Sequence, residues 1–293
     1  MKYSLHDLLD NVDSDSINLE NELIQYFENL PDLNPVEIEN WSKDILIFGG
    51  HVLASGSRES VVYLLEQGWN PVFTLLIKQG GIENQWFDLE MECIRKLNYT
   101  PGLLFNRRTE QCGQKVLFKF KRGREWQNRS WSVIRNTVDQ LAAGLIDLMG
   151  NTTPRIAILS ENCLEVACTD IACLTYGFVN VPVQPAAPPT QIEYILNHSE
   201  IEAIFVADSQ HLRMVESILP NLPGIKKIIT YADIASPNPM VKSYKRLIDD
   251  GSASETLEWL EGIRLSVKLD AIATIMYTSG TTGYPKGIVF TYE

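Results

Sequence analysis

The stretch that decides the fold is RIAILSENCLEVACTDIACLTYGFVNVPV, residues 155–183. Its two ends, residues 155–159 and 179–183, are short aliphatic runs of the kind found in buried strands. The middle is a longer apolar segment that reaches Tyr176, and Gly177 after it is typical of the residue that ends a helix. A strand, a helix and a second strand in this order predict one unit of a parallel sheet.

The same alternation continues toward the C-terminus. Further helices are predicted over residues 191–197, 210–219 and near 244–248, and further strands over residues 203–207, 227–231 and 272–277. Strands separated by helices of this length indicate an α/β fold, a doubly wound and mostly parallel sheet with both faces covered. In such sheets, ligands bind beyond the carboxyl ends of the strands.

Upstream of residue 155, the pattern predicts a hairpin followed by a long helix. The hairpin begins at Lys115, turns at Gly123 and returns through Trp126. Ser130 then precedes a segment that ends at Gly150 and has apolar residues every three or four positions: Trp131, Ile134, Val138, Leu141, Leu145 and Leu148. This spacing predicts a helix with one buried face.

Residues 1 to about 95 form a separate, acidic, helix-rich region, followed by a domain over residues 96–293. Within this region, residues 44–50 suggest a short strand that ends in two glycines, and residues 57–66 suggest an amphipathic helix. A glycine turn between a strand and a helix can bind phosphate. The spacing here matches neither the dinucleotide fingerprint nor the P-loop, so a packing turn is favoured. The role of the region is left open.

Composition excludes several classes of protein. With 293 residues that are 45% hydrophobic, the chain can bury a core, and its net charge of -12 argues against nucleic acid as a partner. The five cysteines are an odd number without CxxC pairs, which implies neither a disulfide framework nor a zinc site. Each of the four histidines is expected to be a surface or helix-face residue: His6, His51, His198 and His211.

The sequence also bears on location. The N-terminus lacks the apolar core of a secretory signal, and the longest apolar run, residues 171–183, is too short to span a bilayer. A cytoplasmic location is therefore expected. Peripheral membrane contact stays open.

The last predicted strand leads into YTSGTTGYPKG, residues 277–287, which combines three glycines, four Ser or Thr hydroxyls and a lysine. Glycines allow successive amides to point inward as an anion-binding nest, and the hydroxyls and the lysine add donors and charge. The natural guest is a polyphosphate. The segment is not a P-loop, because Lys286 is followed by Gly287 and Pro285 disfavours helix at Tyr284. The alternative is a polar hairpin turn.

This segment resembles the signature of the AMP-forming synthetases, the family of acyl-CoA synthetases, luciferases and peptide-synthetase adenylation domains. Supporting segments occur in the family's order at residues 130–131, 141–145, 155–162 and 177–183. Two further segments are most similar to long-chain acyl-CoA synthetases, at residues 125–131 and 191–196. The resemblance covers about residues 100–293, as part of the N-terminal domain of an adenylate-forming enzyme.

The resemblance implies a two-step ligation. A carboxylic acid, by resemblance a long-chain fatty acid, attacks Mg2+-bound ATP to form acyl-AMP and pyrophosphate, and the thiol of CoA then displaces AMP. The hydroxyls and the lysine would hold the β- and γ-phosphates: Thr278, Ser279, Thr281, Thr282 and Lys286. The glycines would let the backbone approach them: Gly280, Gly283 and Gly287. These are binding residues; no catalytic residue and no metal ligand is assigned.

The sequence departs from the family pattern in two places. Relatives carry a His after a Thr shortly beyond the lysine, whereas here Thr291 is followed by Tyr292. The sequence also ends at Glu293, before the family's adenine-binding strand, its Mg-binding acid and its C-terminal domain. The chain alone is therefore expected not to complete the reaction.

Three functions remain open. The first is an acyl-CoA synthetase of which this chain is the N-terminal part. The second is a fatty acyl-AMP ligase that loads an acyl carrier protein instead of CoA. The third is a truncated, non-catalytic nucleotide-binding or regulatory module. Acyl chain length, thiol acceptor and oligomeric state are left open by the sequence.

Overall fold

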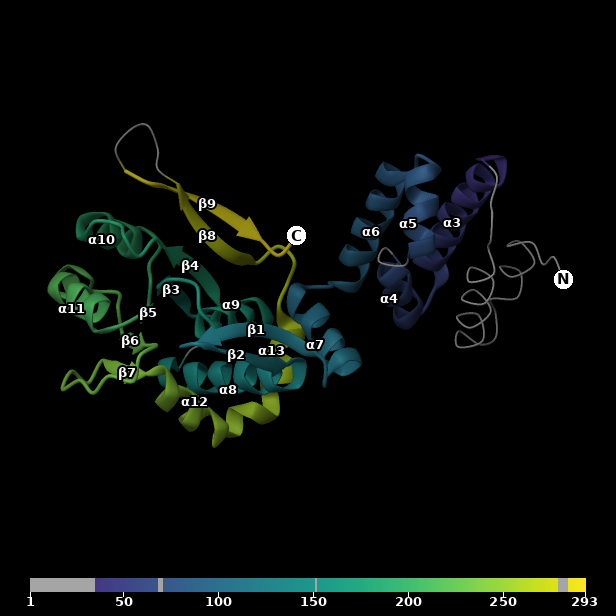
Figure 1. Ribbon diagram of the computed structural model, residues 1–293. Coiled ribbons are helices and arrows are strands. Elements are labelled where there is room, and N and C mark those ends of the chain that lie inside the picture. The colour runs from purple at the N-terminus through teal and green to yellow at the C-terminus, as the bar shows by residue number, and fades with distance from the viewer. Residues whose placement is uncertain (1–34, 68–70, 151, 279–283) are drawn as a thin grey trace. The chain divides into compact units, whose positions relative to one another are not determined.

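The computed structural model describes residues 35–67, 71–150, 152–278 and 284–293 (Figure 1). The chain divides into two compact units, Met1–Tyr99 and Thr100–Glu293. Each unit has its own hydrophobic core.

The described part of the first unit is helical. Its helices are α3 (Pro35–Ser55), α4 (Arg58–Gln67), α5 (Pro71–Gln79) and α6 (Glu83–Leu97). The amphipathic helix predicted over residues 57–66 is confirmed by α4, whose Val61 and Leu64 are buried. The core of the unit combines apolar side chains from all four helices, among them Phe48, Phe73 and Trp86.

The strand predicted over residues 44–50 is wrong, because these residues lie in the middle of α3. A short apolar run does not distinguish a strand from a buried helix segment. In α3 the side chains of Ile45, Phe48 and Val52, three and four positions apart, are buried on one face. Gly49 is a packing position, since a Cβ added there would lie 2.2 Å from Cδ2 of Leu89 on α6.

The second unit contains a seven-stranded sheet in the order β7-β6-β5-β3-β4-β8-β9 (Figure 1). The strands are β3 (Arg155–Leu159), β4 (Val179–Val183), β5 (Ala203–Val206), β6 (Lys227–Thr230), β7 (Val241–Ser243), β8 (Ile272–Thr278) and β9 (Lys286–Thr291). All neighbouring pairs are parallel except β8 and β9, which are antiparallel. The predicted α/β, mostly parallel sheet is confirmed. The sequence pattern did not reveal β7 or β9.

Helices cover both faces of this sheet. One face packs against α8 (Trp131–Met149), α9 (Leu164–Tyr176), α12 (Tyr244–Ser252) and α13 (Leu260–Ser266), and the other against α10 (Pro189–His198) and α11 (Ser209–Ile218). Alternate residues of β3 serve the two cores: Ile156 and Ile158 belong to the first, Ala157 and Leu159 to the second. This alternation is the period of two that a strand imposes on its side chains.

The predicted hairpin and long helix are also present. Helix α7 (Pro101–Cys112) precedes the hairpin of β1 (Val116–Arg122) and β2 (Glu125–Ser130). Ser130 caps α8 by accepting a hydrogen bond from the amide of Val133, and Gly150 ends that helix with φ of 60°. Two short 3₁₀ segments, η1 (Leu219–Asn221) and η2 (Glu255–Trp259), complete the described elements. Over the described ranges, the helices fall short of the length and apolar character that crossing a membrane requires.

Candidate functional site

A cavity of about 340 Å³ lies where β4 and β8 end, beside α10. It is lined by residues from the end of β4 and the turn after it, from α10, and from the end of β8: Pro182, Gln184, Ala187, Gln191, Ile195, Tyr277 and Thr278. The two strands are parallel neighbours, so their carboxyl ends meet at one edge of the sheet. This edge is where α/β sheets bind ligands.

The polyphosphate-binding segment predicted over residues 277–287 starts at this edge. Thr278 ends β8 and Lys286 begins β9, and the two are cross-strand partners. Five of the predicted binding residues lie outside the described residues: Ser279, Gly280, Thr281, Thr282 and Gly283. Of the others, the structure brings Thr278, Lys286 and Gly287 together at one end of the β8–β9 pair. The loop thus connects two antiparallel strands, whereas a P-loop connects a strand to a helix.

The side chains of Thr278 and Lys286 are both exposed. Within the described ranges, no carboxylate forms an ion pair with Nζ of Lys286. An ammonium group on a flexible stem can therefore turn toward an anion without breaking an existing contact. The same described residues contain no group of three His, Cys, Asp or Glu side chains that could hold a metal ion.

Gly287 has a second role that the sequence did not reveal. It pairs with Tyr277 across the two strands. A Cβ added to Gly287 would lie 3.1 Å from Cζ and 3.3 Å from the hydroxyl oxygen of Tyr277, and 3.1 Å from Cγ2 of Ile275. The ring of Tyr277 therefore lies against the backbone of β9, and a Cβ at position 287 would require its neighbours to shift by a few tenths of an ångström. Whether Gly287 also approaches a phosphate stays a prediction.

The sequence predicts that His198 is a surface or helix-face residue, and its exposed position on α10 confirms this. In the structure it ends α10, and its Nδ1 lies 2.7 Å from the hydroxyl of Tyr277, within hydrogen-bond distance. Burial raises the pKa of the Tyr277 phenol, against a smaller opposing effect of Ser199. The sequence shows that Tyr194 and His198 are four positions apart and can share one face of a helix. It does not show that His198 contacts Tyr277 on β8.

Tyr292, at the position where the resembling family has His, is buried. It packs with Val267 and Ala273, and its hydroxyl donates to the carbonyl of Cys173, 3.1 Å away. Burial raises the pKa of this phenol as well. The side chain therefore supports the packing of β8 against α9 and is not open to a substrate.

A buried polar contact joins β4 to α9 behind the site. Nδ2 of Asn180 donates to Oδ1 of Asp170 at 2.6 Å, and the backbone carbonyl of Asn180 accepts from Oγ1 of Thr274 at 2.8 Å. Burial raises the pKa of Asp170, although the Asn180 bond opposes the shift. No cation contacts this carboxyl group within the described part of the chain, so ionisation there is poorly compensated.

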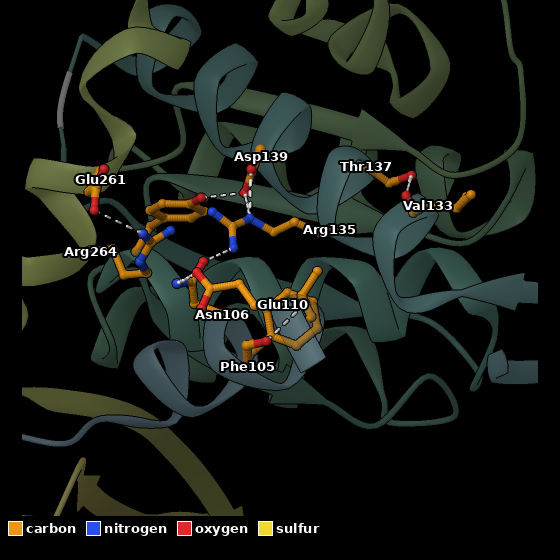
Figure 2. A network of polar contacts seen from close by, with 11 residues as sticks. Phe105, Asn106, Glu110, Val133, Arg135, Thr137, Asp139, Glu261 and Arg264 are labelled. Atoms are coloured by element: carbon orange, nitrogen blue, oxygen red, sulfur yellow. Dashed lines mark hydrogen bonds and ion pairs between the residues drawn. The ribbon is translucent and has the colours of Figure 1, made fainter. Parts of the chain in front are cut away.

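A second polar network joins α7 and α8 (Figure 2). Nε of Arg135 donates to both carboxylate oxygens of Asp139, at 2.8 and 2.7 Å, and another nitrogen of Arg135 donates to Asn106. The hydroxyl of Tyr176, on α9, donates to Asp139 as well. Asp139 thus accepts hydrogen bonds from Arg135 and from Tyr176. Together with the Arg135–Asn106 bond, these contacts connect α7, α8 and α9.

Arg264 lies to the left of these contacts in Figure 2. It is 4% exposed, and its nearest acidic partner is Glu261, 3.8 Å from Nη2. Neither Nε nor Nη1 has a hydrogen-bond partner among the described residues. The network supports helix packing and contributes no group to the cavity between β4 and β8.

Comparison with known proteins identifies a family for the second unit. A family model described as "AMP-binding enzyme" matches residues 105–293. The chain is 30% identical over 171 residues to Long-chain-fatty-acid--CoA ligase FadD15 of Mycobacterium tuberculosis, covering 57% of this chain and 27% of that protein. It is 31% identical over 160 residues to the peroxisomal long chain acyl-CoA synthetase 7 of Arabidopsis thaliana, covering 52% and 22%. The chain thus spans about a quarter of the length of these relatives.

Solved structures support the fold. A putative long-chain-fatty-acid CoA ligase from Rhodopseudomonas palustris superposes with a TM-score of 0.53 at 21% identity, over 66% of this chain and 44% of that one. A fatty acyl CoA synthetase of Mycobacterium tuberculosis superposes with a TM-score of 0.52 at 18% identity, over 68% and 36%. The α/β unit over residues 100–293 therefore has the fold of the N-terminal part of adenylate-forming enzymes.

Proposed function

The chain belongs to the AMP-binding enzyme family, and we propose that it supplies the ATP-phosphate end of the active site of an AMP-forming acid–thiol ligase. The reaction activates a carboxylic acid as acyl-AMP and then transfers the acyl group to CoA. One observation carries the proposal: Thr278 and Lys286 are cross-strand partners at the two ends of the segment between β8 and β9, and Thr278 lines the cavity at the carboxyl edge of the sheet.

The donor set of the loop fits a polyphosphate. The exposed hydroxyl of Thr278 would bind the β- and γ-phosphates, together with Ser279, Thr281 and Thr282 from the segment that follows it. The exposed ammonium of Lys286, which forms no ion pair within the described ranges, would bind them as well. Gly280, Gly283 and Gly287 would let backbone amides contribute. Mg2+ commonly reaches such sites bound to the phosphates of ATP, with few protein ligands of its own.

The chemical contribution of these residues is electrostatic. When a carboxylate attacks the α-phosphate of ATP, negative charge develops on the departing pyrophosphate. Donors that already point at that position stabilise the charge without reorganising. The lysine adds a full positive charge to the same place. The loop thereby lowers the barrier of the first step and takes no part in proton transfer.

The substrate class rests on the relatives. The two compared with this chain are named as a ligase of long-chain fatty acids and as a long chain acyl-CoA synthetase. We carry a long-chain fatty acid and CoA over to this chain as part of the proposal. The Arabidopsis relative is named as peroxisomal, and a cytoplasmic location for this protein stays a prediction, as does any peripheral membrane contact.

The test is exchange of labelled pyrophosphate into ATP, measured on the protein as its cells make it, with and without a long-chain fatty acid. Exchange that requires the fatty acid supports acid activation. Conversion of CoA to acyl-CoA in the same preparation then excludes a ligase that loads only a carrier protein. A preparation that binds Mg2+-ATP but exchanges no pyrophosphate with any acid would support the non-catalytic module instead.

A further inference from the structure

Four rings connect α10 to both ends of the loop. Tyr284 lies against Tyr194 with ring centroids 4.8 Å apart, and Tyr194 stacks on His198 at 5.2 Å. His198 meets Tyr277 edge-on at 5.8 Å and lies within hydrogen-bond distance of its hydroxyl. Tyr277 immediately precedes Thr278, and Tyr284 lies two residues before Lys286. Tyr277 and Tyr284, on either side of residues 278–283, are therefore joined through a helix outside the loop.

Tyr194 and His198, the two α10 residues of this cluster, stack on each other. Tyr194 and His198 are four positions apart, so their side chains share one face of the helix, and their rings lie nearly parallel at 26°. The opposite face of α10 is held in the core, where Ile192, Ile195 and Leu196 are buried. A change in the position of these rings would require the helix to move in its core contacts.

The two loop-flanking residues are held differently. Tyr277 is enclosed by β9, because its ring lies against Gly287. Tyr284 is 69% exposed, and among the described residues Tyr194 is the aromatic ring that it contacts. Pro285 is buried and restricts Tyr284 to extended backbone. The tilted ring contact of Tyr284 with Tyr194 therefore holds the chain where it re-enters β9.

We propose that Tyr194 and His198 are positioning residues for the polyphosphate loop. By holding Tyr277 and Tyr284, they keep the hydroxyl of Thr278 and the ammonium of Lys286 at the spacing that a polyphosphate needs. The inference rests on the proposed function of the loop. Holding the ends of a loop in advance lowers the entropy lost when it binds a ligand, so the effect should appear in ATP affinity more than in turnover.

The hydrogen bond between Nδ1 of His198 and the hydroxyl of Tyr277 can run in either direction, depending on the tautomer of the imidazole. In both directions it holds the two rings together, so the arrangement acts through position.

The first experiment compares Tyr194→Ala, Tyr194→Phe and His198→Ala, with His211→Ala on α11 as a control outside the cluster. The readouts are KM for ATP and kcat in pyrophosphate exchange, together with Tm. Tyr194→Ala and His198→Ala should each raise KM by roughly 2- to 10-fold, the scale of one aromatic contact. Their kcat should stay within about two-fold of the starting value. Tyr194→Phe keeps the aromatic ring, so its KM for ATP should equal that of the starting protein.

A second measurement needs no nucleotide. In the free protein, Tyr194→Ala should speed hydrogen exchange of the backbone amides of residues 284 and 286–288, while amides of β3 exchange as before. Unchanged exchange at these amides together with unchanged KM would overturn the proposal. A protein that binds no Mg2+-ATP would refute the proposed function and its role for these residues, while the exchange rates would still decide whether α10 holds the ends of the loop.

Discussion

Thr278 and Lys286 are cross-strand partners, and the antiparallel pairing of β8 with β9 holds their backbones opposite each other. The residues between them carry the rest of the predicted binding groups. The strand pairing therefore brings a hydroxyl and an ammonium group, which has no ion-pair partner among the described residues, to neighbouring positions at this end of the sheet.

Lys286→Ala should reduce fatty-acid-dependent pyrophosphate exchange by roughly 100-fold, the cost of losing one preorganised donor to a developing charge. Lys286→Arg should retain part of the activity, because it keeps the charge but changes the donor geometry. The control is Lys245→Ala, an exposed lysine on α12. If Lys286→Ala exchanges pyrophosphate as fast as Lys245→Ala does, the loop does not bind the phosphates of ATP.

Gly287→Ala should destabilise the protein by about 1–3 kcal/mol, because the new Cβ displaces the ring of Tyr277 from β9. The free energy of unfolding from denaturant melts measures this. Gly262→Ala is the matched control: a Cβ there meets nothing within 4 Å, and it should be neutral or slightly stabilising in a helix. In a Tyr277→Ala background, the penalty of Gly287→Ala should largely disappear; a penalty of full size there would contradict the ring contact.

Asp170→Asn should stabilise the protein at neutral pH. Burial raises the pKa of Asp170 in the folded state, so the folded state holds this proton more tightly than the unfolded state does. Its contribution to stability is therefore complete below the ordinary carboxyl pKa and is lost as pH rises through the raised one.

The measurement is Tm of Asp170→Asn against the starting protein at pH 4 and pH 7. The difference should be small at pH 4 and favour the variant at pH 7. Asp270→Asn, at an exposed carboxylate, serves as the control. An equal difference at both pH values would mean that the effect comes from packing and not from ionisation.

Tyr292→Phe should cost about 0.5–1.5 kcal/mol of stability, toward the lower end, because the Cys173 carbonyl keeps its bond from the amide of Gly177. KM for the fatty acid should not change, since the phenol is buried in the core and points at α9. Steady-state kinetics over a series of acid concentrations checks this. A raised KM with unchanged stability would place Tyr292 at the substrate and contradict its position in the structure.

The sequence by itself determined the local features of the second unit. The bounds of β3 and β4 agree with the aliphatic runs at residues 155–159 and 179–183. Ser130 and Gly150 begin and end α8 as expected. These features depend on caps, turns and the alternation of apolar residues, which act over a few neighbouring positions. The loop signature is likewise contained in consecutive residues.

Only the tertiary structure decided which distant residues meet. It placed β9 antiparallel at the sheet edge, brought His198 to Tyr277, and turned the apolar run at residues 44–50 into the core face of a helix. An apolar run or an apolar helix face predicts that its side chains are buried. It does not predict which residues they pack against. The partner is selected when the whole chain packs, because burial energy depends on area and shape and not on distance along the sequence.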